Sequence, residues 1–157
     1  MIESDAVQLM PPLAVATGMI AGTVVIHMIG LIVLMALLQS RSHNLKPMQN
    51  ALRQGIFIVL VVLGLVVIHA VEIWLYALVY RALGEFPTLE AALYFSTSSF
   101  TTVGYGDVVL DERWRLVGAI EGFNGLLLIG WSTAFLVSVI GKLRAAELAW
   151  LDRMRDS

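Results

Sequence analysis

Residues 101–107 read TTVGYGD, a run of small, hydroxylated and aromatic side chains that contains two glycines. Long apolar stretches lie on both sides of it. Residues 55–80 carry only Glu72 as a charged side chain, and residues 116–140 carry only Glu121. Both stretches exceed the roughly 20 apolar residues that cross a bilayer, and residues 13–39, which have no charge, form a third. The sequence therefore predicts an all-α membrane protein.

The composition of the chain agrees with that class. It is 59% hydrophobic and 14% charged, and its mean hydropathy is +0.84. A water-soluble alternative would have to bury three long apolar helices inside 157 residues, which leaves too little chain to cover them. The absence of cysteine excludes disulfides and thiolate metal sites. The first residues, MIESDAVQLM, lack the basic start of a cleavable signal peptide, so we expect the first span to remain in the mature protein.

The basic residues predict the orientation of the chain. Most of them lie between the first two spans or after the third: Arg41, Lys46, Arg53, Lys142, Arg144, Arg153 and Arg155. The rest, Arg81, Arg113 and Arg115, lie among acidic residues. Because basic residues favour the cytoplasmic side, we expect residues 40–54 and the tail 143–157 inside and residues 1–12 outside. The expected location is the cell membrane, as a multi-pass protein, with a bacterial inner membrane favoured.

Residues 88–100, TLEAALYFSTSSF, are expected to form a short helix. Thr88 is a suitable N-cap, and Glu90 suits the positive end of the helix dipole. At 1.5 Å per residue such a helix is about 18 Å long, too short for ~30 Å of hydrocarbon. The segment must therefore enter the membrane and return. Non-helical backbone at that depth has to be enclosed by protein or line water, so several copies should gather around it.

The glycines of the loop explain what it would do there. Gly104 and Gly106 can adopt positive φ without steric cost, so successive carbonyls can turn to the same side. When copies meet on an axis, the carbonyls of residues 102–105 would form rings of oxygen that replace a cation's hydration shell. The alternative is an ordinary extracellular turn that contains two glycines.

The heptapeptide resembles the potassium-channel signature, and it matches the TVGYG selectivity filter at all five positions: Thr102, Val103, Gly104, Tyr105 and Gly106. The resemblance implies a potassium-selective homotetramer whose pore fold occupies residues 55–142. It has an outer helix at 55–80, a pore helix at 88–100, a filter at 101–107 and an inner helix at 115–140. The transmembrane helix at 13–39 is additional to this fold. The ligands of K⁺ would be the backbone carbonyls of residues 102–105.

The resemblance also implies residues that support the filter. In the family, the carboxylate after the filter commonly bonds to a tryptophan and sometimes to an acidic side chain of the pore helix. Here Asp107 is present, but Tyr94 and Ser98 stand where those partners would be. We therefore expect a bond from the Tyr94 hydroxyl to Asp107, with Thr101 completing the support. The alternative is that Tyr94 only belongs to an aromatic cuff with Phe95.

Two acidic side chains are expected near the depth of the filter. Because a bare carboxylate in lipid costs about 3 kcal/mol or more, Glu72 and Glu121 should face protein or water. One hypothesis places both in a proton-sensitive shell with three serines of the short helix, Ser96, Ser98 and Ser99. The alternative is a pair of fixed structural hydrogen bonds without regulation.

The third span resembles the inner helix of the family, with Gly125 at the spacing of its hinge glycine. Four residues at helical spacing are expected to line the cavity or gate: Leu126, Ile129, Thr133 and Val137. Asn124 lies on another face and should bond to a neighbouring helix. Gly118, Gly122 and Gly130 are expected at close-packing positions.

These features predict a potassium channel subunit that conducts K⁺ passively as a homotetramer and catalyses no reaction. We expect no cofactor other than K⁺ ions in the filter, and no partner besides membrane lipids and further copies. Nucleic acid and other small-molecule substrates are not expected. The first span lacks the arginine series of a voltage sensor, and the tail is expected to form a short helix at the inner membrane surface. The alternatives are a subunit of an active potassium transporter and a non-conducting regulatory subunit of another channel.

Overall fold

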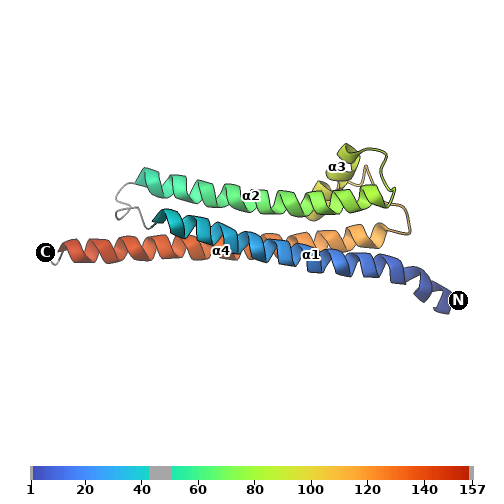
Figure 1. Ribbon diagram of the computed structural model, residues 1–157, viewed down its shortest axis with the longest axis horizontal. Helices are drawn as coiled ribbons and strands as arrows, with labels where there is room; N and C mark the ends of the chain where they lie inside the picture. The colour runs from blue at the N-terminus through green and yellow to red at the C-terminus, as the bar shows by residue number, and fades with distance from the viewer. Residues whose placement is uncertain (1, 43–50, 156–157) are drawn as a thin grey trace.

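A computed structural model describes residues 2–42 and 51–155 of the chain. The described elements are four helices: α1 (Ile2–Ser42), α2 (Ala51–Ala82), α3 (Leu89–Phe100) and α4 (Arg115–Arg155). The three long helices lie side by side, and α3 sits at one end of the bundle, the end that also holds the N-terminus (Figure 1). The C-terminus lies at the opposite end.

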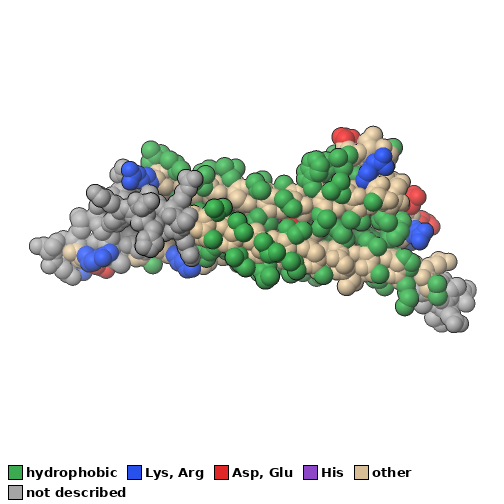
Figure 2. Space-filling model, viewed as in Figure 1, with side chains coloured by type: hydrophobic (Ala, Val, Ile, Leu, Met, Phe, Trp, Pro, Cys, Tyr) green, Lys and Arg blue, Asp and Glu red, His purple; other side chains and the backbone are tan. Residues whose placement is uncertain are grey.

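The three long helices are each long and apolar enough to cross a membrane, over Val7–Leu38, Leu52–Ala82 and Arg115–Ala145. Hydrophobic side chains cover the middle of the bundle in Figure 2, and charged side chains gather towards its two ends. Acidic side chains are seen mainly at the end that carries α3. The expected class, an all-α membrane protein, is confirmed.

Two helices are longer than expected. α1 begins at Ile2, so much of the segment expected to precede the first span is helical, with Pro11 and Pro12 inside the helix. α4 continues through Gly141 to Arg155, so the separate tail helix expected at 143–157 is wrong. One glycine costs a helix only about 1 kcal/mol, and the residues that follow it, Lys142 to Ala145, are good helix formers. The expected loop 40–54 includes residues 43–50, which lie outside the described residues.

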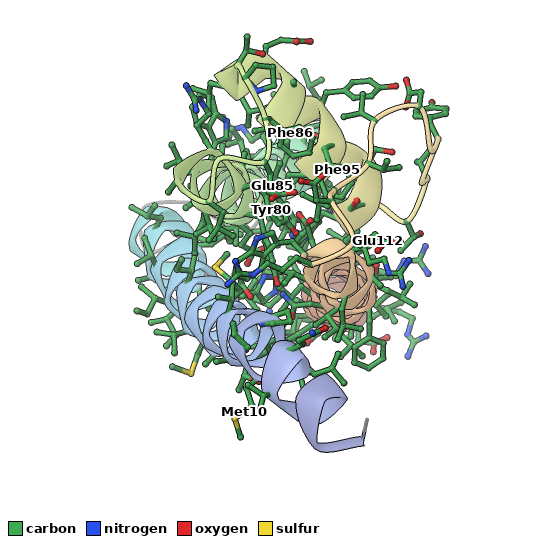
Figure 3. All side chains as sticks on the ribbon, turned by 90° about the vertical axis from the view of Figure 1, so that its right-hand side faces the viewer. Met10, Tyr80, Glu85, Phe86, Phe95 and Glu112 are labelled. Atoms are coloured by element: carbon green, nitrogen blue, oxygen red, sulfur yellow. The ribbon has the colours of Figure 1, made fainter. Side chains whose placement is uncertain are left out.

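The short helix α3 is capped as predicted. Thr88 has an extended backbone, and its hydroxyl accepts a hydrogen bond from the Ala91 amide at 3.1 Å. α3 contacts α2 and α4. Its Phe95 ring lies 5.3 Å from both the Tyr80 ring of α2 and the Phe86 ring of the connecting turn, centroid to centroid. Figure 3 shows these three rings gathered beneath α3. This aromatic cluster fixes the position of the loop that follows.

The additional helix α1 packs against α2 and α4, and within the described residues it makes no comparable contact with α3. Its seam with α2 is reciprocal. A Cβ on Gly30 would come within 2.7 Å of the Ile68 side chain, and a Cβ on Gly64 would come within 2.6 Å of Leu34. Each helix thus provides a glycine notch for an aliphatic side chain of the other, as small residues do in membrane helix pairs.

Candidate functional site

The loop at residues 101–107, called the filter loop below, follows α3 directly. Positive φ angles occur at Thr102 (62°), Gly104 (58°) and Gly106 (76°), and so at every second residue. The positive φ expected at the two glycines is confirmed. Thr102 is the unexpected member, because a β-branched residue rarely adopts this conformation. The residues between them, Val103 and Tyr105, keep ordinary negative φ.

The backbone amides of the filter loop bond to the C-terminal end of α3. The amides of Val103 and Gly104 donate to the Ser98 carbonyl at 3.0 and 3.1 Å, and that of Thr102 donates to the Ser99 carbonyl at 2.9 Å. The Tyr105 amide donates to the Ser98 hydroxyl at 3.2 Å. Within the described part of the chain, the carbonyls of residues 102–105 accept no hydrogen bond. The backbone amides of residues 102–105 thus donate to α3, while the backbone carbonyls of the same residues accept no hydrogen bond from the described residues.

Ser98 therefore supports the loop differently from the acidic pore-helix residue whose place it takes in the family pattern. It bonds to the amides of the filter loop through both its carbonyl and its hydroxyl, and not to Asp107. Thr101 caps the end of α3, where its hydroxyl donates to the Thr97 carbonyl at 2.7 Å. Both residues hold the start of the loop against α3.

The expected link between Tyr94 and Asp107 is present. The Tyr94 hydroxyl donates to the Asp107 carboxylate at 2.8 Å, and this bond raises the pKa of the tyrosine. The Tyr94 ring also stacks on Tyr105, with centroids 6.4 Å apart and an interplanar angle of 14°. The side chain of Tyr105 thus lies against α3, and the far end of the loop is fixed by an aromatic contact and a hydrogen bond.

Gly125 lies where α4 meets the end of α3. A Cβ at this position would overlap the Phe100 carbonyl oxygen, which is a backbone atom and cannot turn away. Gly118 and Gly122 face Phe95 and the Ser99 carbonyl, as expected of close-packing positions. Gly130 has no atom within 4 Å of such a Cβ among the described residues, so close packing there does not occur within one chain. Gly125 belongs to the close-packing group, and its expected role as a hinge stays a prediction.

The four residues expected to line a cavity share one side of α4. Leu126, Thr133 and Val137 are exposed in the single chain, and Ile129 is partly buried. The Thr133 hydroxyl donates to the Ile129 carbonyl of its own helix at 2.9 Å. Ile129 packs against the hydrophobic core of the chain, whereas the other three side chains are left exposed. These three are free to face an axis, another copy or lipid.

The two buried acids do not form the single shell that was expected. Glu121 accepts hydrogen bonds from Ser96 at 2.6 Å and from Tyr80 at 2.7 Å. Of the three serines proposed for the shell, only Ser96 bonds to an acid within the described residues. The Ser98 hydroxyl instead accepts from the Tyr105 amide of the filter loop. Tyr80 comes from α2 and was missed, since nothing in a span that is apolar all round indicates which helix it faces.

Glu72 belongs to a separate network. Its two carboxylate oxygens contact the Nδ1 atoms of His27 at 2.9 Å and of His69 at 2.8 Å. His27 belongs to α1 and lies 45 residues away in sequence. The expectation that Glu72 lies in a shell with Glu121 is therefore wrong. The i,i+3 spacing of His69 and Glu72 was visible in the sequence, but the contribution of α1 was not.

The expectation for Asn124 is confirmed. Its side-chain amide donates to the Thr23 hydroxyl of α1 at 2.8 Å and to the Tyr76 hydroxyl of α2 at 3.2 Å. One buried side chain of α4 thus bonds to both neighbouring helices. Buried polar groups of this kind fix how the three spans meet, because lipid offers them no alternative partner.

Comparison with known proteins places part of the chain in a family. A family model described as an ion channel matches residues 56–142, which is more than half of the chain and includes most of α2, all of α3, the filter loop and most of α4. No curated protein and no solved structure matches the chain. The matched region leaves out α1.

Proposed function

Because the chain belongs to the ion-channel family whose model matches residues 56–142, we propose that it is the pore subunit of a potassium-selective channel. Four copies would surround one axis and conduct K⁺ passively, without catalysing a reaction. The filter would be residues 102–106, and the ligands of K⁺ would be the backbone carbonyls of Thr102, Val103, Gly104 and Tyr105.

The observation that carries this proposal is how the filter loop uses its backbone groups. The amides of residues 102–105 are bonded to α3, and the carbonyls of these residues accept nothing within the described residues. Positive φ at every second residue lets successive carbonyls share a side. Rows of free carbonyls are the groups that replace the hydration shell of a potassium ion in a filter. A simple connecting turn has no need of this arrangement.

The exposure of the loop supports a symmetric assembly. All residues from Thr101 to Asp107 are exposed in the single chain, and Val103 and Tyr105 are 54% and 70% exposed. Non-helical backbone between membrane helices needs protein or water around it. Further copies supply that enclosure, and one filter loop per chain fits a four-fold axis. α3 ends at Phe100, so the negative end of its dipole adjoins the loop and favours a cation there.

The two ends of the bundle support the proposed orientation. The N-terminus, α3 and the filter loop share one end, while the C-terminus lies at the other (Figure 1). We place the first end outside the cell and the C-terminus in the cytoplasm, because most basic residues flank the second end. Cysteine labelling can test this: the chain has none, so single cysteines introduced near each end report their side to an impermeant reagent.

Flux measurements on purified protein in liposomes test the proposed function. We expect barium-sensitive K⁺ flux and little Na⁺ flux from wild type. Gly104→Ala should abolish the flux. Alanine is strained at the φ of +58° that Gly104 adopts, and a change in this angle would turn a carbonyl of the filter. Gly84→Ala is the matched control, since Gly84 has φ of +81° and equally open surroundings but lies in the α2–α3 turn.

The outcomes separate the proposal from its alternatives. Equal K⁺ and Na⁺ flux would refute selectivity, and flux that survives Gly104→Ala would refute the role of the loop. A silent wild-type protein that is folded would favour a regulatory subunit. Mass measurement of the detergent-extracted assembly tests the tetramer independently of conduction.

A further inference from the structure

Four side chains from three helices form a closed ring at the centre of the bundle. They are His27 of α1, His69 and Glu72 of α2, and Ser132 of α4. The side chains of His27 and Glu72 are fully buried, and that of His69 is 17% exposed. The ring lies outside both the filter loop and the Glu121 network.

The hydrogen bonds of the ring fix the protons on the two imidazoles. Both Nδ1 atoms face the Glu72 carboxylate, which only accepts, so both rings carry their proton on Nδ1. When both rings are neutral, each Nε2 then holds a lone pair. Both Nε2 atoms face the hydroxyl oxygen of Ser132, at 2.9 Å from His69 and 3.5 Å from His27.

With two neutral imidazoles, this arrangement is one proton short. A serine hydroxyl carries a single hydrogen, but two imidazole lone pairs converge on it. The shorter contact, to His69, takes that hydrogen, and the Nε2 of His27 then faces an oxygen that has none left to give. A proton on the Nε2 of His27 would meet this need, and so would a cation that accepts lone pairs from both nitrogens and the oxygen.

We propose that the Nε2 atoms of His27 and His69, with the Ser132 hydroxyl, form a binding site for a divalent transition-metal cation of the Zn²⁺ class. Zn–N bonds of about 2.0–2.1 Å place neighbouring tetrahedral ligands roughly 3.3–3.4 Å apart. The two Nε2–Oγ distances, 2.9 and 3.5 Å, lie on either side of that separation.

Glu72 supplies the second requirement of such a site. Metal-binding histidines typically donate their other ring N–H to a carboxylate, which fixes the ring and strengthens the ligand. Here one carboxylate does so for both rings. Its negative charge also compensates part of the charge of the cation, which a buried site requires. Imidazole ligands favour Zn²⁺ and similar ions over Mg²⁺ or Ca²⁺, which prefer oxygen.

The position of the site gives it a structural consequence. A bound cation would join α1 to α2 and α4, and so fasten the additional helix to the rest of the bundle. The His69 ring lies 5.8 Å from the ring of Phe100, the last residue of α3, and the His27 ring lies 5.2 Å from that of Trp131 of α4. The metal would therefore sit behind the base of the filter loop.

Zinc uptake by the purified, EDTA-treated assembly tests the proposal without reference to conduction. After Zn²⁺ is added and excess removed, we expect one zinc per chain by elemental analysis, and no comparable uptake of Mg²⁺. His27→Gln, whose amide can still donate to Glu72, should lose this zinc. Glu72→Gln should weaken zinc affinity 10–100-fold, as loss of a supporting carboxylate does. His43→Ala removes the remaining histidine of the chain and should leave uptake unchanged.

The proposal fails if wild type takes up no zinc or if His27→Gln binds it as wild type does. X-ray absorption by zinc-loaded wild type provides a readout that needs no variant to fold. Two imidazole nitrogens at about 2.0–2.1 Å support the site. A spectrum without imidazole scattering overturns it.

Discussion

The two sides of this bundle differ in how many of their groups find partners within one chain. Behind α3, buried polar side chains bond to partners on other helices of the same chain, as Glu121 does to Tyr80 and Asn124 does to Thr23. On the opposite side, the filter loop and the Leu126–Val137 face of α4 are mostly exposed. The comparison indicates that the chain fixes its own scaffold and leaves exposed the side that further copies would enclose in the proposed channel.

The largest effect on stability is expected at the contact between Gly125 of α4 and the Phe100 carbonyl at the end of α3. Gly125→Ala places a methyl group on the Phe100 carbonyl, so either α3 or α4 must shift. We expect a loss of about 1–3 kcal/mol in stability, as overpacking causes, together with loss of the assembled form. Thermal unfolding and size-exclusion chromatography measure both.

The matched control is Gly141→Ala in the same helix, where an added Cβ meets nothing within 4 Å. It should be neutral or slightly stabilising, because alanine favours helix by about 1 kcal/mol over glycine. Equal destabilisation by both changes would contradict the assigned contact.

A pair of tyrosine variants compares a buried and an exposed hydrogen bond. Tyr80→Phe removes a buried donor from the Glu121 carboxylate and should cost about 1–3 kcal/mol. Tyr94→Phe removes the same atom at the exposed Asp107 and should change stability much less. Thermal unfolding of the two variants side by side provides the measurement. A larger loss of stability from Tyr94→Phe than from Tyr80→Phe would contradict the view that the buried side is the one stabilised within a single chain.

A threonine pair tests the seam between α1 and α4. Thr23→Val keeps the shape of the side chain but removes the acceptor of the Asn124 amide, at an expected cost of about 1 kcal/mol. Thr133→Val removes a hydroxyl that bonds only to its own helix on an exposed face, and should cost less. Stability curves in the same detergent compare the two. Indistinguishable curves would count against Asn124 as the link between these helices.

A change at the exposed end of the filter loop should have the smallest effect on stability. It should, however, affect conduction. Tyr94→Phe should change the inactivation or conductance of the channel, since Asp107 loses its partner in α3. The bond to Asp107 raises the pKa of Tyr94, so the donor persists through neutral pH and is lost only as the pH rises above the ordinary tyrosine range. Single-channel recordings that match wild type would leave the bond without a role in conduction.

Local features of the sequence were enough for much of this structure. The three spans follow from apolar runs of sufficient length, and the short helix follows from Thr88 and a length that cannot cross the membrane. The positive φ of Gly104 and Gly106 follows from glycine itself, and the Tyr94 bond to Asp107 was expected from the family resemblance. Each of these depends on residues that are close together in the chain.

What only the tertiary structure decided is which helix each buried polar group meets. Glu72 and Glu121 lie at similar depth, but one bonds to histidines of α1 and α2, and the other bonds to Tyr80 and Ser96. Nor did the sequence indicate that Gly125 lies on the Phe100 carbonyl, or that α1 would contribute His27 to the centre of the bundle. The physical reason is that these spans are apolar on every side, so no hydrophobic periodicity records which face of one helix packs against which neighbour.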